Sequence, residues 1–151
     1  MSRTRIRVAG AWVDLTRGPK GDQGIQGLQG LTGPSGIGGV FTGFVSGLLV
    51  AGAGGTKLWN DSGGDVTIAS TRATLVTPPG GGPATFDVNL NGTTIFTNQA
   101  HRPSIAAGGT TSGLVVPDVT LWPAGQYLTV DTDLIGTSYA GANLTFQIGL
   151  V

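Results

Sequence analysis

Residues Gly18 to Gly39 read GPKGDQGIQGLQGLTGPSGIGG, and glycine fills every third position of this stretch. In the collagen triple helix three polyproline-II chains share one axis, and only glycine fits where each third residue meets that axis. A single chain cannot form this structure, because its backbone groups find their partners on the other two chains. The repeat therefore predicts a homotrimer with a stalk over residues 18–39, about 65 Å long at about 3.1 Å per residue. The axial residues are Gly18, Gly21, Gly24, Gly27, Gly30, Gly33, Gly36 and Gly39.

The alternative for this stretch is a flexible glycine-rich linker. A flexible linker has no reason to keep strict phase, so the triple helix is favoured. Lys20 and Asp22 stand at a Lys-Gly-Asp spacing that resembles an interchain ion pair of bacterial collagen-like stalks. Proline fills triplet positions only at Pro19 and Pro34, so the stalk is expected to be weak alone and to need trimerising domains at its ends.

The chain before the stalk has the pattern of a short hairpin. Arginine occupies alternate positions of RTRIRV (residues 3–8), which is the two-residue period of a strand. Ala9 and Gly10 suit a tight turn, and residues 12–15 can return as a second strand. An isolated hairpin is marginal in water, so its side chains are expected to pack on sister chains or on another protein. Residues 1–17 are interpreted as an anchor, with a mere trimer cap as the alternative, and the anchoring residues are Arg3, Arg5, Ile6, Arg7, Val8, Trp12 and Val13.

Composition and charge narrow the function classes. The chain has 151 residues and no cysteine, which excludes a disulfide framework and a thiolate metal site. Its first 21 residues carry net charge +4 (five basic, one acidic), and the rest carries −4 (three basic, seven acidic). A basic foot suits an acidic docking surface, and the alternative is a solvated basic terminus. No basic stripe interleaved with aromatic residues exists, so nucleic acid is not an expected partner. The N-terminus lacks the apolar run of a secretory signal.

Residues 37–55 form an uncharged passage, IGGVFTGFVSGLLVAGAGG. Its length and its glycines spaced by four would suit a transmembrane helix. Seven glycines among its nineteen residues, and the adjoining stalk, instead favour a short neck followed by a buried strand over residues 44–50.

From residue 56 onward, short strand patterns alternate with turns. Residues 86–91 alternate apolar and polar side chains, and Asn91-Gly92 is a strong hairpin signal. A strand is expected over residues 114–121, at an edge or bulge because it contains Pro117. The last strand places Leu144, Phe146, Ile148 and Leu150 on one face. The fold class predicted for residues 40–151 is therefore all-β, an antiparallel, jelly-roll-like β-sandwich head.

No catalytic, metal-ligating or cofactor-binding pattern rises above background. His101 is the one histidine, no nucleophile-elbow motif accompanies it, and a surface loop is its expected place. Calcium would have to use aspartates such as Asp131 with Asp133 or Asp61 with Asp65, but the twelve-residue calcium-loop spacing is absent. The prediction is a protein that is not an enzyme and holds no metal and no cofactor.

Three aromatic residues are candidates for stacking against sugar rings: Trp59, Trp122 and Tyr139. Exposed aromatic rings on a sandwich offer sugars a flat apolar face. Packing in the core is the more frequent role for a lone tryptophan. Trp122 stands in Leu-Trp-Pro-Ala-Gly at the end of an expected strand, where a loop tip would expose it.

The order of these parts resembles minor tail and fibre proteins of tailed phages that infect actinobacteria. The resemblance begins with Ala-Gly-Ala-Trp-Val in the hairpin and Gly-Pro-Lys-Gly-Asp in the stalk. The head segments that are similar to the head domain of such proteins are residues 91–97, 102–109, 117–120 and 127–131. The resemblance covers nearly the whole chain, implies a virion surface protein, and brings no catalytic residues with it.

The expected function is that of a structural virion protein, a trimeric short fibre assembled in the host cytoplasm and placed on the virion surface. Residues 1–17 would dock on a tail, baseplate or major capsid protein, and the head would attach to a host-surface polysaccharide. One alternative is a capsid-decorating head fibre that stabilises the particle or displays the head. A second is a bacterial collagen-like surface protein with a sugar-binding head, and a third is an enzyme such as a depolymerase. Neither a membrane nor nucleic acid is an expected partner.

The stalk prediction is tested by Gly27→Ala, which places a methyl group at the crowded axis. We expect a lower melting temperature of the triple helix by circular dichroism and a smaller trimer fraction in sedimentation. Gln26→Ala is the matched control, because that position points away from the axis. Unchanged melting and trimerisation in Gly27→Ala would contradict the triple helix.

Overall fold

The computed structural model describes residues 5–14 and 38–151. They fall into two separate units, an N-terminal one and a head. Arg3 and the expected stalk up to residue 37, including Lys20 and Asp22, lie outside the described residues.

The N-terminal unit is an antiparallel hairpin, as predicted. Strand β1 (Arg5–Val8) pairs with β2 (Ala11–Asp14). The two turn residues, Ala9 and Gly10, have φ values of 51° and 88°. Positive φ at both central positions is the property of the two-residue turns that match the twist of paired strands.

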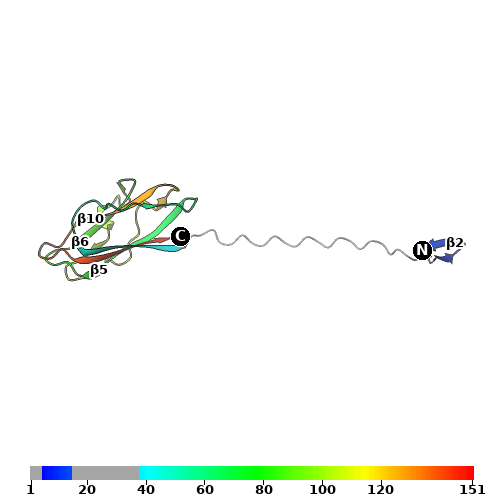
Figure 1. Cartoon of the computed structure of the whole chain (residues 1–151), viewed down its shortest axis with the longest axis horizontal. Coiled ribbons are helices and arrows are strands. Elements are labelled where there is room, and N and C mark those ends of the chain that lie inside the picture. Colours follow the sequence, from blue (N-terminus) through cyan, green and yellow to red (C-terminus); the bar gives the residue numbers. More distant parts are fainter. Residues whose placement is uncertain (1–4, 15–37) are drawn as a thin grey trace. The chain divides into compact units, whose positions relative to one another are not determined.

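The head contains two antiparallel sheets (Figure 1). The four-stranded sheet has the order β3 (Gly39–Leu48), β11 (Ala142–Leu150), β5 (Val66–Thr77), β9 (Leu121–Trp122). The five-stranded sheet has the order β4 (Leu58–Trp59), β10 (Tyr127–Leu134), β6 (Ala84–Leu90), β7 (Thr93–Thr94), and β8 (Ser104–Ile105) also pairs with β6. A single 3₁₀ turn, η1 (Gln99–His101), is the one helical element among the described residues. The prediction of an all-β, antiparallel, sandwich-like head is confirmed.

Apart from β6, β7 and β8, which share one sheet, successive strands of the head alternate between the two sheets. The chain moves from β3 to β4 in the other sheet, returns with β5, crosses again for β6, β7 and β8, and finishes with β9, β10 and β11 in alternate sheets. Every strand therefore pairs with strands that are distant in the sequence, apart from the β6–β7 hairpin. β11 lies between β3 and β5 and pairs with both.

The core lies between the inward faces of the sheets. Phe86 of β6 and Phe146 of β11 meet edge to face, with ring centroids 6.4 Å apart, so this contact joins one sheet to the other. The largest fully buried apolar side chains around it are those of Trp122, Phe96, Ile68, Ile95, Ile105, Leu128 and Val88. Leu144, Phe146 and Ile148 are buried, as the alternation of the last strand predicted.

Most sheet edges in the head are short or covered. β4, β7 and β8 have two residues each. Residues 110–120 lie along the remaining edge of β5 and cover it. The hydrogen bonds include Thr71 N to the oxygen of Val115 (2.7 Å) and Leu75 N to the oxygen of Thr110 (2.9 Å). β3 is the exception, because Val40 to Leu48 are all exposed and no described strand pairs with its outer edge.

Two expectations for the strands of the head have opposite outcomes. The Asn91-Gly92 hairpin is confirmed, with φ values of 49° and 85° at the turn. The regular strand expected over residues 114–121 is wrong, since that segment meets β5 through isolated bridges and only Leu121 begins β9. Pro117 lacks the N–H that a continuous ladder would need.

The passage over residues 37–55 also differs from expectation. Residues Gly39–Leu48 form a strand, so a transmembrane helix is wrong for them. Within residues 5–14 and 38–151, no helix has the length and apolar character needed to cross a membrane. The strand begins earlier than expected and is exposed in the single chain, and Leu49 is the buried residue at its end.

Phe86→Ala tests the contact between the sheets. Phe86 is fully buried, so the truncation is expected to lower the free energy of unfolding by about 3–5 kcal/mol. Urea unfolding followed by tryptophan fluorescence measures this loss. Leu121→Ala, at a side chain that is 51% exposed, is the control and is expected to change stability by about 0.5 kcal/mol. Equal effects of the two substitutions would contradict this description of the core.

Candidate functional site

The N-terminal hairpin has one apolar face and one mixed face. The register pairs Ile6 with Val13 and Val8 with Ala11, so these four side chains share a face. Ile6, Val8 and Val13 are 44%, 53% and 45% exposed, which leaves this apolar row open to water. The structure thus brings together three residues that the sequence assigned to the anchor.

The opposite face of the hairpin carries Arg5, Arg7 and Trp12. The guanidinium carbon of Arg7 lies 5.9 Å from the centre of the Trp12 ring, within the range of a cation–π contact. Trp12 is 65% exposed. An apolar row backed by a basic, aromatic face is suited to docking on a surface that offers both an apolar groove and acidic groups.

Trp59 belongs to a small aromatic cluster at one end of β10. Its ring lies 5.1 Å from that of Tyr127, and the register pairs the two residues across β4 and β10. The ammonium of Lys57 lies 4.3 Å from the centre of the Tyr127 ring. Trp59 is 50% exposed, so part of its ring is available for stacking. Tyr127 had no distinguishing signal in the sequence, because only the register joins it to Trp59, and Lys57 enters the cluster through its contact with Tyr127.

The other two aromatic candidates do not join this cluster. Trp122 is 2% exposed and its indole N–H donates to the oxygen of Gln126 (3.0 Å), so it is a core residue with no ring face for a sugar. Tyr139 is 42% exposed, and it bridges to Gly80 beyond the far end of β10. The eight residues of β10 separate that end from Trp59 by roughly 23 Å. The three candidates therefore do not form one stacking platform.

His101 forms a hydrogen-bonded pair with Asp118. Its Nδ1 atom lies 2.8 Å from Oδ1 of Asp118, and its Nε2 atom lies 3.1 Å from Nδ2 of Asn98. Both ring nitrogens thus have partners, and no hydroxyl among the described residues hydrogen-bonds to the ring. The nearby Ser104 hydroxyl instead contacts that of Thr85 (3.1 Å). The hydrogen bonds of His101 and Asp118, here called the clasp, hold the loop in place. In the described part of the chain, the His101 ring has no hydroxyl bonded to it that could act as the nucleophile of a catalytic triad.

Asp118 holds the loop that contains η1. Its Oδ2 atom accepts from the backbone N–H of Asn98 (2.8 Å) and from the hydroxyl of Thr97 (3.1 Å). The Asn98 bond, followed by the bond with His101, lowers the pKa of Asp118 below its ordinary value, because these donors favour the ionised carboxylate.

Three aspartates gather where β6 and β10 pair, but each has its own partners. Asp87 is buried and accepts from Val88 N (2.7 Å) and from the hydroxyl of Thr94 (2.7 Å), and burial raises its pKa despite these bonds. Asp131 accepts from Gly54 N and from the Asn89 side chain, both at 2.8 Å. Asp133 forms an ion pair with Arg102.

These partners leave no open set of oxygen ligands for a cation. Within the described part of the chain, no group of three histidine or acidic side chains is arranged to hold a metal ion. Asp65, which belongs to the other pair considered for calcium, accepts from Ala124 N (2.9 Å).

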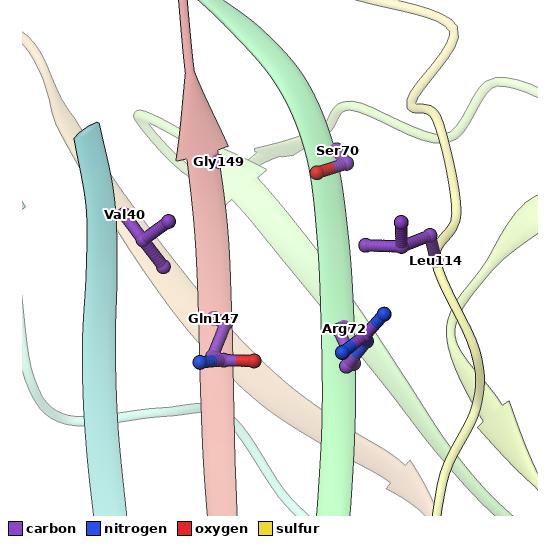
Figure 2. A pocket seen from close by; sticks show the side chains of 6 residues that line it. All are labelled: Val40, Ser70, Arg72, Leu114, Gln147 and Gly149. Carbon is purple, nitrogen blue, oxygen red and sulfur yellow. The ribbon is translucent and has the colours of Figure 1, made fainter. Parts of the chain in front are cut away.

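The surface of the head is hollowed in at least two places. One, of about 470 Å³, lies beside the His101 loop and is lined by His101, Arg102, Ser104, Ser112, Leu114 and Val116 among others. The other, of about 240 Å³, lies on the outward face of β3, β11 and β5 (Figure 2). Its lining combines apolar Val40 and Leu114 with polar Gln147, Ser70 and Arg72. Neither is lined by a phenylalanine, tyrosine or tryptophan ring.

Comparison of the chain with protein-family models, with curated proteins and with solved structures produced no match.

The hydrogen bonds of Asp118 predict that the stability of the head depends on pH. A carboxylate with a lowered folded-state pKa contributes stability above its unfolded pKa, and that stability is lost as the pH falls through the folded pKa. Asp118→Asn is therefore expected to lower the urea midpoint at pH 7, and the difference from wild type should shrink as the pH falls below about 4. Urea unfolding at a series of pH values measures this.

The control is Asp61→Asn, at an exposed residue of the turn before β5. It is expected to leave the midpoint unchanged at every pH. A constant difference between Asp118→Asn and wild type from pH 7 to pH 3 would show that the ionised carboxylate is not the stabilising group.

Proposed function

We propose that this chain is a structural protein of a tailed-phage particle, a short homotrimeric fibre. Its N-terminal hairpin docks on a tail or baseplate protein, its collagen-like stalk gathers three chains, and its head is displayed at the far end of the stalk. Docking on the capsid, as a decorating head fibre, is the second candidate, and the tail is favoured only slightly.

The observation that carries this proposal is the strict glycine period of residues 18–39 between the two described units. A triple helix is a spacer that also fixes the number of chains at three. The chain therefore combines a small unit with an open apolar row, a trimeric spacer and a separate head with its own core. A fibre that holds a display domain away from a docking point needs these three parts in this order.

We infer further that the head is a jelly roll. If β7 and β8 are counted as one interrupted strand beside β6, the head has eight strands. One sheet then contains the first, eighth, third and sixth, and the other the second, seventh, fourth and fifth. This is the strand order of a double-sheet jelly roll, an architecture common in viral capsid and lectin domains. The likeness concerns the fold, and it is the stalk and hairpin that point to a virion.

Display on a trimer allows weak individual sites to act together. Three heads on one stalk raise the effective concentration of each site, so apparent affinity can far exceed that of one head. Trp59, half exposed beside Tyr127 and Lys57, is the residue whose environment best suits stacking on a host-surface polysaccharide.

The location is tested on particles of the phage that encodes the chain. We expect the protein in purified virions, and a gold-labelled antibody against the head should mark the tail tip or baseplate in electron micrographs. Label over the capsid would select the decorating fibre instead. Absence of the protein from purified virions would overturn the proposal.

The docking role of the hairpin is tested by Val13→Asp, which places a charge in the apolar row. We expect incorporation into virions to fall at least about tenfold, because a charge buried without a partner is costly at an interface. Leu121→Asp, at a head residue of similar exposure, is the matched control and should incorporate normally. Quantitative immunoblots of purified particles measure both. Normal incorporation of Val13→Asp would exclude the apolar row as the docking surface.

A further inference from the structure

Strand β3 is the most unusual surface of the head. It has ten residues, GVFTGFVSGL, with no charged side chain. Its large apolar residues are exposed in the single chain: Val40 65%, Phe41 43%, Phe44 63%, Val45 53% and Leu48 58%. A long, apolar, uncharged edge strand is a ready template for association, and soluble proteins normally blunt such edges with charges, bulges or covering loops.

Both faces of β3 contribute to this surface. Its pairing with β11 places Phe44 opposite Thr145, on the outward face of the sheet, and Val45 opposite Leu144, on the inward face. The inward residues of β11 are buried, but Val45 remains half exposed. The second sheet therefore does not cover the inward row of β3, and an additional layer is needed to exclude water from both rows.

The outward face beside β3 contains an unsatisfied polar atom. The Nε atom of Arg72 on β5 is buried and has no hydrogen-bond partner among the described residues. Figure 2 shows Arg72 on the same face as Gln147 of β11 and Val40 of β3, around the hollow of about 240 Å³. A buried donor without an acceptor is costly, so this face of the single chain is not fully satisfied.

The start of β3 indicates which chain covers it. β3 begins at Gly39, which is also the last glycine of the three-residue repeat. A triple helix brings its three chains to one axis, so three copies of β3 must begin side by side where the repeat ends. β3 itself has no charged side chain with which to form an ion pair, whereas the N-terminal hairpin carries two exposed arginines.

We propose that β3 and the outward face of its sheet form the contact between heads, and that two further copies of this chain cover them. This inference rests on the proposed homotrimer. The head then has a second role besides display, because the contact between heads holds the three chains together at the end of the stalk. The stalk is poor in proline and is expected to be weak alone. The heads then act as the clamp that keeps the three chains in register.

The test compares Phe44→Asp with Leu134→Asp in the full-length chain. Phe44 lies on β3, and Leu134 is an exposed apolar residue at the end of β10 in the other sheet (47% exposed). We expect Phe44→Asp to raise the trimer dissociation constant in sedimentation equilibrium at least about tenfold and to lower the melting temperature of the stalk. Leu134→Asp should change neither, and far-ultraviolet circular dichroism should show that both heads are folded.

Hydrogen exchange on the wild-type chain gives a readout that needs no variant. The backbone amides of β3 that point away from β11 should be protected in the trimer, because sister chains exclude water from them. A wild-type trimer in which these amides exchange freely, or in which Phe44→Asp behaves as Leu134→Asp does, would overturn the proposed contact and leave the homotrimer intact. A wild-type chain that sediments as a monomer would overturn both. Neither result depends on where the protein lies in a virion.

Discussion

The head depends on the burial of two facing rows of apolar side chains, joined by the edge-to-face contact of Phe86 and Phe146. With one row per strand committed to the interior, the opposite rows of β5 and β11 are rich in threonine, serine and glutamine. β3 differs from them, because both of its faces carry large apolar side chains that are exposed. The hydrophobic effect that holds the sheets together therefore leaves these side chains of β3 uncovered inside one chain, although its backbone pairs with β11.

The sequence predictions that are confirmed rest on local signals, namely turn residues and the alternation of apolar and polar side chains. The turns at Ala9-Gly10 and Asn91-Gly92 have positive φ values, and the glycine of each turn, with Asn91, readily accepts them, so these residues mark hairpins without any knowledge of the rest of the fold. Alternation in the last strand identified a half-buried surface in the same way. The irregular path of residues 110–120 was not predictable from local pattern, since its apolar residues follow a neighbouring strand through isolated bonds.

The candidate site shows the same limit. Trp59 and Trp122 each follow a leucine in a two-residue strand, yet one is half exposed and the other is in the core. Their burial is decided by the face of the sheet on which the register places each ring, since Trp59 pairs with partly exposed Tyr127 and Trp122 pairs with buried Val66. Pairing between distant segments has no signature in the sequence around either tryptophan. The clasp between His101 and Asp118 likewise depends on how the loop after β7 folds back.

The central position of β11 has a consequence for biosynthesis. β3 and β5 leave the ribosome well before β11, and neither can complete its pairing in the four-stranded sheet until that strand arrives. Such non-local closure is slow compared with helix or hairpin formation. During this interval the uncharged β3 segment is exposed on every nascent chain, so chains made close together on one messenger can meet before their heads are complete. Synthesis on one messenger would then favour association with sister chains, whereas refolding of isolated chains at high concentration would favour aggregates.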